Sequence, residues 1–145
     1  KHSKNALNLA TWLQEQEEVT WVNYPGLKSS KYNSLAKKYL PDGQSGVVTF
    51  GVKGGYNSAK IIANETEIFS LLANIGDSKS LIIHPASTTH QQLTDEEQES
   101  TGVTKDLIRL SVGLEHLDDL KSDLIQAFQK LDTKVSAEAF SLNGH

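Results

Sequence analysis

The chain has 145 residues, 37% hydrophobic and 22% charged, with a formal net charge of −4. These values are typical of one soluble globular domain, and the acidic balance argues against a nucleic-acid partner. No apolar run approaches the roughly 20 residues that span a bilayer, and the chain has no cysteine for disulfides, zinc–thiolate sites or a thiol nucleophile. We therefore expect a cytoplasmic protein with no membrane partner.

The chain begins inside a helical pattern. Residues 1–17 are predicted to form an amphipathic helix, with Leu9 and Leu13 among its apolar residues at helical spacing. Little upstream resembles a cap, and the chain has no methionine. We therefore expect residues 1–145 to be a single domain cut from a larger polypeptide, with this helix leading in from the missing part.

Strands are predicted at several places further along the chain. Alternation indicates strands in EVTWVN, which ends at a Tyr-Pro-Gly turn, and in GVVTFGVKGG at 46–55. Two short apolar runs follow, around 69–72 and 81–83, separated by a turn. A last strand spans 107–114 and alternates between an apolar face and a mixed face that carries Arg109.

Helices are predicted between these strands. Residues 31–40 read as a basic helix, and helical spacing returns at 56–65. Thr94 and the glutamate three residues later form a capping box, which predicts a short acidic helix. A leucine-rich stripe predicts a helix at 116–131, and the tail at 132–145 is poorly patterned. The mixture predicts an α+β fold, a four-stranded, largely antiparallel sheet with helices packed mainly on one face.

Arg109 is a permanent charge within an otherwise apolar strand. One interpretation is that it points to solvent or pairs with a surface carboxylate, because charged residues are rarely buried unpaired. The other is that its guanidinium binds a carboxylate or phosphate, which its planar fork can hold through two hydrogen bonds. The residues alone leave both open.

Other candidate sites are weaker. His84 and His90 lack the further ligands and spacing of a metal site, and the glycines of GVKGGYNS lack the spacing of a P-loop or dinucleotide fingerprint, so a strand-to-helix turn explains them better. No GxSxG elbow is present. Because no nucleophile-and-base pair emerges, we expect no catalytic residue, no metal site and no cofactor-binding residue in this chain.

Four long motifs nevertheless resemble the C-terminal end of the Cys/Met-metabolism family of pyridoxal-phosphate (PLP) enzymes. They are VNYPGL, GVVTFGVKGG, ANIGDSKSLIIHPASTTH and GVTKDLIRLSVGLEHLDDL. The resemblance reaches to about residue 131 and implies the small C-terminal domain of a fold-type-I enzyme. It also implies that the partner is the missing large PLP domain of the same polypeptide, and that the attachment lysine lies there rather than in this chain.

The resemblance assigns roles to three residues. The arginine of the family's R-L-S-V-G motif binds the α-carboxylate of the amino-acid substrate, and Arg109 occupies that place. Asn74 stands where many relatives carry a serine, and an asparagine at this position is similar to O-acetylhomoserine sulfhydrylases. The resemblance implies that Asn74 binds the same carboxylate. Thr89, in the family's T-H pair, is expected to face the active site, with His90 structural.

The resemblance implies a γ-replacement that makes homocysteine from O-acetylhomoserine and sulfide, by a PLP-dependent transferase of methionine biosynthesis that is a homo-oligomer at full length. The isolated chain is expected to be inactive. Cystathionine synthases and methionine or cystathionine γ-lyases are alternatives within the family. A non-catalytic amino-acid-binding or interaction module is an alternative outside it.

Overall fold

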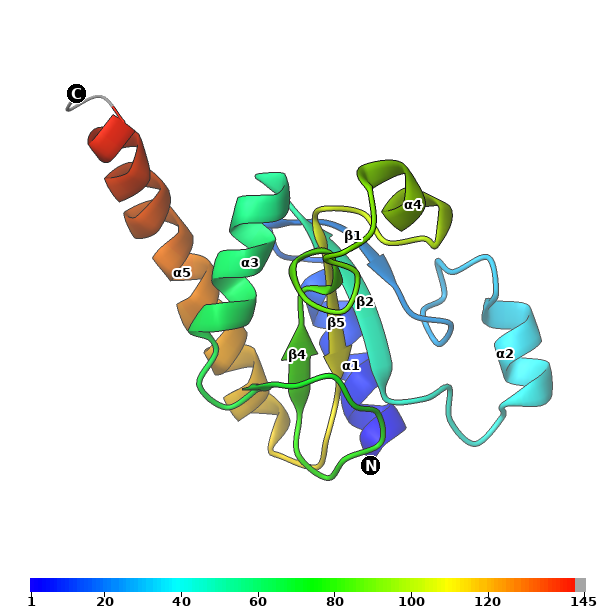
Figure 1. The fold of residues 1–145 in the computed structure, drawn as a ribbon. Coiled ribbons are helices and arrows are strands. Elements are labelled where there is room, and N and C mark those ends of the chain that lie inside the picture. The colour runs from blue at the N-terminus through cyan, green and yellow to red at the C-terminus, as the bar shows by residue number, and fades with distance from the viewer. Residues whose placement is uncertain (143–145) are drawn as a thin grey trace.

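The computed structural model describes residues 1–142, except for the side chains of residues 135–140 and 142. Eleven elements follow one another in these residues (Figure 1). They are α1 (His2–Leu13), β1 (Val19–Asn23), α2 (Asn33–Tyr39), β2 (Val47–Val52), α3 (Gly55–Glu65), β3 (Ser70–Leu71), β4 (Leu81–Ile83), the 3-10 helix η1 (Pro85–Ser87), α4 (Asp95–Ser100), β5 (Leu107–Ser111) and α5 (Leu117–Leu142).

The strands form one five-stranded sheet in the order β1-β2-β5-β4-β3. Three of its four strand pairs are antiparallel, whereas β3 runs parallel to β4. The prediction of four strands was therefore wrong, although the sheet is largely antiparallel as expected. A strand of two residues is too short to show alternation. Its parallel pairing with β4 depends on the path of the connection at residues 72–80, which local sequence patterns do not reveal.

The apolar faces of the central strands form the core. Val48 lies opposite Leu110, and Phe50 lies opposite Ile108, and all four are fully buried. Apolar residues of α1, α3 and α5 join the same buried cluster, so these three helices cover one face of the sheet, as predicted. Figure 1 shows α1 behind the strands, with α3 and α5 beside it.

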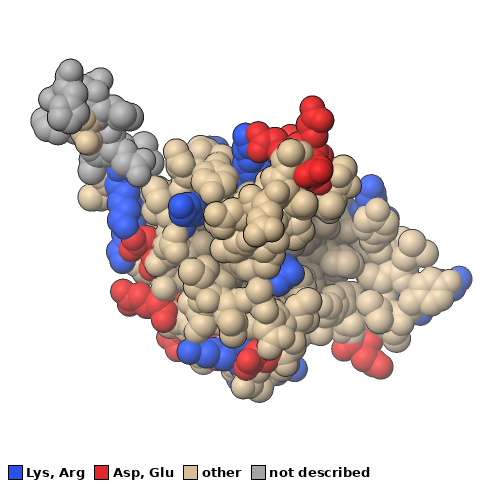
Figure 2. Space-filling model, viewed as in Figure 1, with Lys and Arg blue, Asp and Glu red and all other residues tan. Residues whose placement is uncertain are grey.

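The opposite face of the sheet carries Arg109. Thr49 of β2 and Ile83 of β4 are its partners in the neighbouring strands. Figure 1 shows the connection between β4 and α4, which contains η1, in front of the strands, on the side away from α1. Figure 2, from the same viewpoint, shows a recess between the body of the molecule and the arm that carries α2. The sheet therefore separates the helical core from the face where we expected the site.

Helix α5 is longer than the sequence indicated. It continues to Leu142, beyond residue 131, where the predicted helix ended; the last three residues of the predicted tail lie outside the described residues. The segment after residue 131 contains no proline or glycine up to its end, so nothing in it stops the helix. Among the described residues, no helix is both long and apolar enough to cross a membrane.

Candidate functional site

Arg109 lies near the middle of the sheet and is only partly buried. Among the side chains that the structure describes, no hydrogen bond or ion pair is found for its guanidinium group, whose five N–H groups all need acceptors. Asp106, three residues earlier, accepts a hydrogen bond from Trp21 Nε1 at 3.0 Å. A half-buried guanidinium without a protein partner can receive an external carboxylate.

Asn74 lies in the loop between β3 and β4, where its side chain is exposed. Its Oδ1 atom accepts a hydrogen bond from the N–H of Ile75 at 2.8 Å, and Gly76 follows with a left-handed φ of 80°. The N–H of Gly76 donates to Ser111 Oγ at 3.4 Å. Because Ser111 lies two residues after Arg109 on the same face of β5, this contact brings the Asn74 turn to the Arg109 face.

Thr89 lies in the loop that follows η1, and its side chain is exposed. Its hydroxyl group and His90 Nδ1 are 2.9 Å apart. Residues 88–93 line an open cavity of about 770 Å³. Gln98 of α4 donates from Nε2 to the His90 carbonyl at 2.6 Å and so joins this loop to α4. The structure places Thr89 at an open surface cavity, and in the described part of the chain it has no hydrogen bond to Arg109 or Asn74.

His84 anchors the start of the Thr89 loop. Its ring is buried, with Nε2 2.7 Å from the Lys105 carbonyl and Nδ1 2.8 Å from Ser87 Oγ. The carbonyl can only accept, so Nε2 carries the proton and Nδ1 accepts from Ser87. Burial is the main cause that lowers the pKa of His84. Sequence reasoning rejected His84 as a metal ligand but did not find this anchoring role.

Two residues that sequence reasoning missed lie in the same motif as Arg109. Ser111 accepts the Gly76 bond described above, and the Glu115 carboxylate accepts hydrogen bonds from the N–H and the hydroxyl of Ser80, both at 2.7 Å. The only sequence feature that could have pointed to them is their place in RLSVGLE. Their spacing does not reveal which loop they contact.

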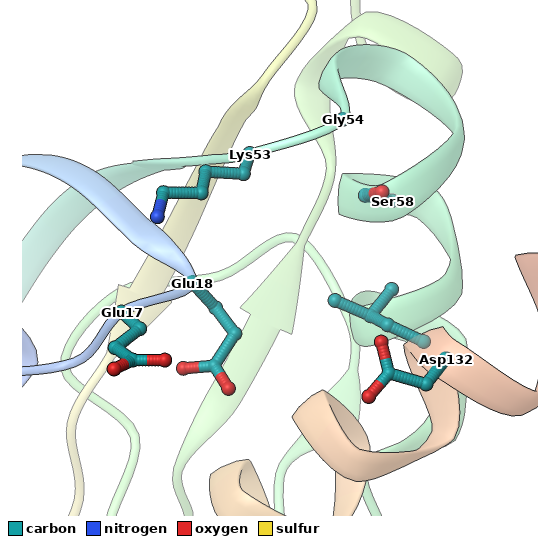
Figure 3. Close-up of a pocket in the computed structure, with 7 residues that line it drawn as sticks. Glu17, Glu18, Lys53, Gly54, Ser58 and Asp132 are labelled. Carbon is teal, nitrogen blue, oxygen red and sulfur yellow. The ribbon is translucent and has the colours of Figure 1, made fainter.

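A separate cavity lies on the helical side of the molecule. It has a volume of about 620 Å³ and lies where β1, β2, α3 and α5 approach one another (Figure 3). Its lining comprises Glu17, Glu18, Lys53, Gly54, Ser58, Leu131 and Asp132. None of the three residues predicted to bind substrate lines it. No group of three or more His, Asp or Glu side chains in the described part of the chain could hold a metal ion.

The glycines before α3 have a local explanation. Gly54 and Gly55 have left-handed φ angles of 89° and 66°, which residues with a Cβ atom rarely adopt. They connect the end of β2 to the first turn of α3. The interpretation of this stretch as a strand-to-helix turn is confirmed.

Comparison with known proteins identifies the family. Residues 1–129 match the model of the Cys/Met metabolism PLP-dependent enzymes. The chain belongs to this family. The match covers the sheet, α1 to α4 and the first part of α5, and therefore includes every predicted site residue.

Similar proteins within the family are named homocysteine synthase or O-acetyl-L-homoserine sulfhydrylase. The chain is 52% identical over 129 residues to homocysteine synthase from Schizosaccharomyces pombe, covering 89% of the chain and 30% of the relative. It is 54% identical over 132 residues to O-acetyl-L-homoserine sulfhydrylase from Leptospira meyeri, covering 90% and 30%. The chain thus spans about 30% of the length of these relatives.

A solved structure supports the fold. A crystal structure of a candidate O-acetylhomoserine (thiol)-lyase from Campylobacter jejuni superposes with a TM-score of 0.82 and 50% identity, over 88% of this chain and 30% of that chain. That protein carries a pyridoxyl-lysine phosphate. The α+β fold of this chain is therefore found within a PLP enzyme.

The family implies PLP, and the described residues can be tested for a fit. The cavity of Figure 3 has one lysine, Lys53, but also three carboxylates, from Glu17, Glu18 and Asp132. A dianionic phosphate is repelled by such a lining. The residues of this cavity do not fit the cofactor. The turn at Asn74, Ile75 and Gly76 has no lysine that could attach it either.

Proposed function

We propose that this chain is the C-terminal, substrate-carboxylate-binding domain of a PLP-dependent O-acetylhomoserine sulfhydrylase. The whole enzyme would replace the acetate of O-acetylhomoserine with sulfide and release homocysteine. PLP and its lysine would belong to the large domain of the same polypeptide, and the complete enzyme would be a homo-oligomer in the cytoplasm. The residues of this chain would bind and orient the amino-acid substrate.

One observation carries the proposal. Arg109 presents a guanidinium with no protein partner among the side chains that the structure describes, on the open face of the sheet. The fork can bind an α-carboxylate through two parallel hydrogen bonds, which fix its direction as well as its charge. Fixed direction matters when a substrate must meet a cofactor at one reacting atom.

Asn74 supports the same role for the neighbouring turn. Its Oδ1 atom is already used by the Ile75 N–H, whereas no acceptor is found for its Nδ2 group in the described residues. An amide with free N–H donors suits a carboxylate. Thr89 is proposed as a further contact at the substrate's edge, since it lies on an exposed loop that starts beside Ile83, the strand partner of Arg109.

The choice of sulfhydrylase rests on the relatives. Proteins named homocysteine synthase and O-acetyl-L-homoserine sulfhydrylase are 51–54% identical to this chain, and one named homocysteine/cysteine synthase is 46% identical. Assaying the full-length enzyme with O-acetylhomoserine plus sulfide, with cystathionine and with methionine separates a sulfhydrylase from a synthase or lyase. Turnover only of cystathionine or methionine would contradict the sulfhydrylase.

The carboxylate role has its own test. Arg109→Ala in the full-length enzyme should lower kcat/KM for O-acetylhomoserine roughly 30- to 1,000-fold, because a charge-assisted bidentate contact is lost. This corresponds to about 2–4 kcal/mol of transition-state stabilisation. Cofactor content should not change, and Arg109→Lys should recover part of the loss. Lys105→Ala is the matched control, since it removes an exposed positive charge four residues away. An unchanged kcat/KM in Arg109→Ala would show that the guanidinium does not bind substrate.

A further inference from the structure

The loop that carries Asn74 is not held by packing. From residue 71 to residue 79 no side chain is buried, and Leu72 and Ile75 are 54% and 60% exposed. A loop without buried apolar contacts has little to fix its position except polar contacts. The polar contacts of this loop therefore decide where Asn74 lies.

Two of those contacts reach the segment that follows Arg109, and a third joins the Asp77 carbonyl to His2 Nε2 of α1, 2.9 Å apart. Ser111 Oγ accepts the N–H of Gly76 at 3.4 Å, and the N–H of Leu114 donates to the Ser78 carbonyl at 2.8 Å. Ser111 is itself only 4% exposed, so its hydroxyl cannot move far. The loop is thus attached to the strand that carries Arg109.

Glu115 and Ser80 close this arrangement. The two oxygens of Glu115 accept from the backbone N–H and the hydroxyl of Ser80, and Ser80 Oγ accepts from the N–H of Gly113 at 2.8 Å. At Gly113 the chains approach so closely that a Cβ atom would lie 2.3 Å from the Ser78 carbonyl oxygen. No Cβ atom fits between the two segments at this crossing, so the loop packs directly against the segment that follows Arg109.

We propose that Ser111 and Glu115 are positioning residues that fix the Asn74 turn relative to Arg109, so that both bind one substrate carboxylate. This inference rests on the proposed function and deepens it. Neither residue touches the substrate. Ser111 holds the turn on the open face of the sheet, and Glu115 holds the end of the same loop through Ser80.

The test uses single and double variants of the full-length enzyme. Ser111→Ala and Glu115→Ala should each raise KM for O-acetylhomoserine roughly 3- to 10-fold, the cost of one or two hydrogen bonds, with a smaller change in kcat and an unchanged KM for sulfide. Glu115→Gln, which keeps one acceptor oxygen, and Ser111→Thr, which keeps the hydroxyl, should recover part of the loss. Glu15→Ala removes an exposed carboxylate elsewhere and is the matched control.

A double-mutant cycle separates positioning from general stability. If Ser111 and Glu115 act through Asn74, their effects on KM should disappear in an Asn74→Ala background, because the group they position is gone. Additive effects, or equal changes in KM for both substrates, would overturn the proposal. Melting temperatures of the holoenzymes identify any alanine variant that does not fold. In that case the KM values of Glu115→Gln and Ser111→Thr take the place of those of the alanine variant.

The two levels of the proposal fail differently. If Arg109→Ala raises KM but Ser111→Ala and Glu115→Ala do not, the positioning role is wrong and the carboxylate site stands. If Arg109→Ala has no effect on KM or kcat, the carboxylate site itself is wrong, and the positioning role is overturned with it.

Discussion

At the scale of single residues, His84 shows how a buried polar group is kept neutral by its surroundings. Its ring donates to the Lys105 carbonyl, accepts from Ser87 and meets the ring of Tyr56 edge-on at 4.9 Å between centroids. Lys60 further disfavours the charged form, whereas Asp106 and the Lys105 carbonyl favour it more weakly than burial opposes it. The ring therefore connects the loop of Thr89 to the start of β5 as a neutral group.

This environment predicts a pH dependence of stability. Because folding lowers the pKa of His84, the unfolded chain binds the proton more readily, and the stabilisation is fully present above the unfolded value of about 6.5. It should be lost as the pH falls from there through the folded pKa, by at most about 1.4 kcal/mol per pH unit. Urea unfolding of the parent chain and of His84→Gln at several pH values between 7.5 and 5 measures this.

The His84→Gln variant is the control for every other titrating group of the parent chain. The parent should lose more unfolding free energy on acidification than His84→Gln, which cannot take up the proton at this position. Parallel pH profiles for the two proteins would contradict the assigned shift. His90 and His116, which remain in both proteins, cancel in the comparison.

At the scale of elements, α5 and the segment before β3 are joined by one buried carboxylate. Asp123 is 4% exposed and accepts the N–H groups of Glu67, Ile68 and Phe69 at 2.7, 2.8 and 2.9 Å. These three donors belong to a loop that has no strand partner there. The carboxylate takes the place of a strand partner and leads the chain into the two-residue β3.

Removing this carboxylate should therefore cost more than a surface charge. Asp123→Ala leaves three N–H groups without acceptors and is expected to lower the free energy of unfolding by about 2–4 kcal/mol, since each unsatisfied buried group costs about 1–3 kcal/mol and water relieves part of it. Chemical denaturation measures the change. Asp132→Ala, on an exposed position of the same helix, should change stability by less than about 0.5 kcal/mol. Equal effects of the two substitutions would show that the loop contacts do not contribute.

At the scale of the whole molecule, the chain has a continuous core but an open functional face. The core cluster joins α1, α3, α5 and the central strands, whereas Arg109 is partly exposed and Asn74 and Thr89 are exposed on the other side. Large apolar side chains are also exposed on the arm around α2. They are Tyr32 (49%), Leu35 (54%), Tyr39 (67%) and Leu40 (49%). The buried core and the residues of the proposed site therefore lie on opposite faces of the sheet.

This division predicts a folded but inactive isolated chain. It should unfold in one cooperative transition, because its core is a single cluster. It should retain no stoichiometric lysine-bound pyridoxal, because the cavity that contains Lys53 is lined by three carboxylates. The measurement is to mix the purified chain with PLP, remove the excess, and record the visible spectrum and homocysteine formation. A stoichiometric band abolished by Lys53→Ala, or turnover by the isolated chain, would contradict the prediction.

Local patterns in the sequence were enough to predict most of the helices and strands and to single out Arg109. Alternation located β1, β2 and β5, helical spacing located α1, α3 and α5, and the capping box at Thr94 is present with both of its hydrogen bonds. These features depend on contacts between residues a few positions apart, which a one-dimensional pattern records. Arg109 was noticed for the same reason, because a charge interrupts a local apolar pattern.

Contacts between segments far apart in the chain could not be predicted from such patterns. These contacts join residues 11 to 56 positions apart: the parallel pairing of β3, the three donors on Asp123, and the attachment of the Asn74 loop to Ser111 and Glu115. Such contacts form because the core brings the segments together, and a polar residue that satisfies a distant backbone group has the same local sequence as one that faces water. For that reason the sequence RLSVGLE drew attention to Arg109, whereas the contacts of Ser111 and Glu115 with the loop that carries Asn74 are seen only in the folded chain.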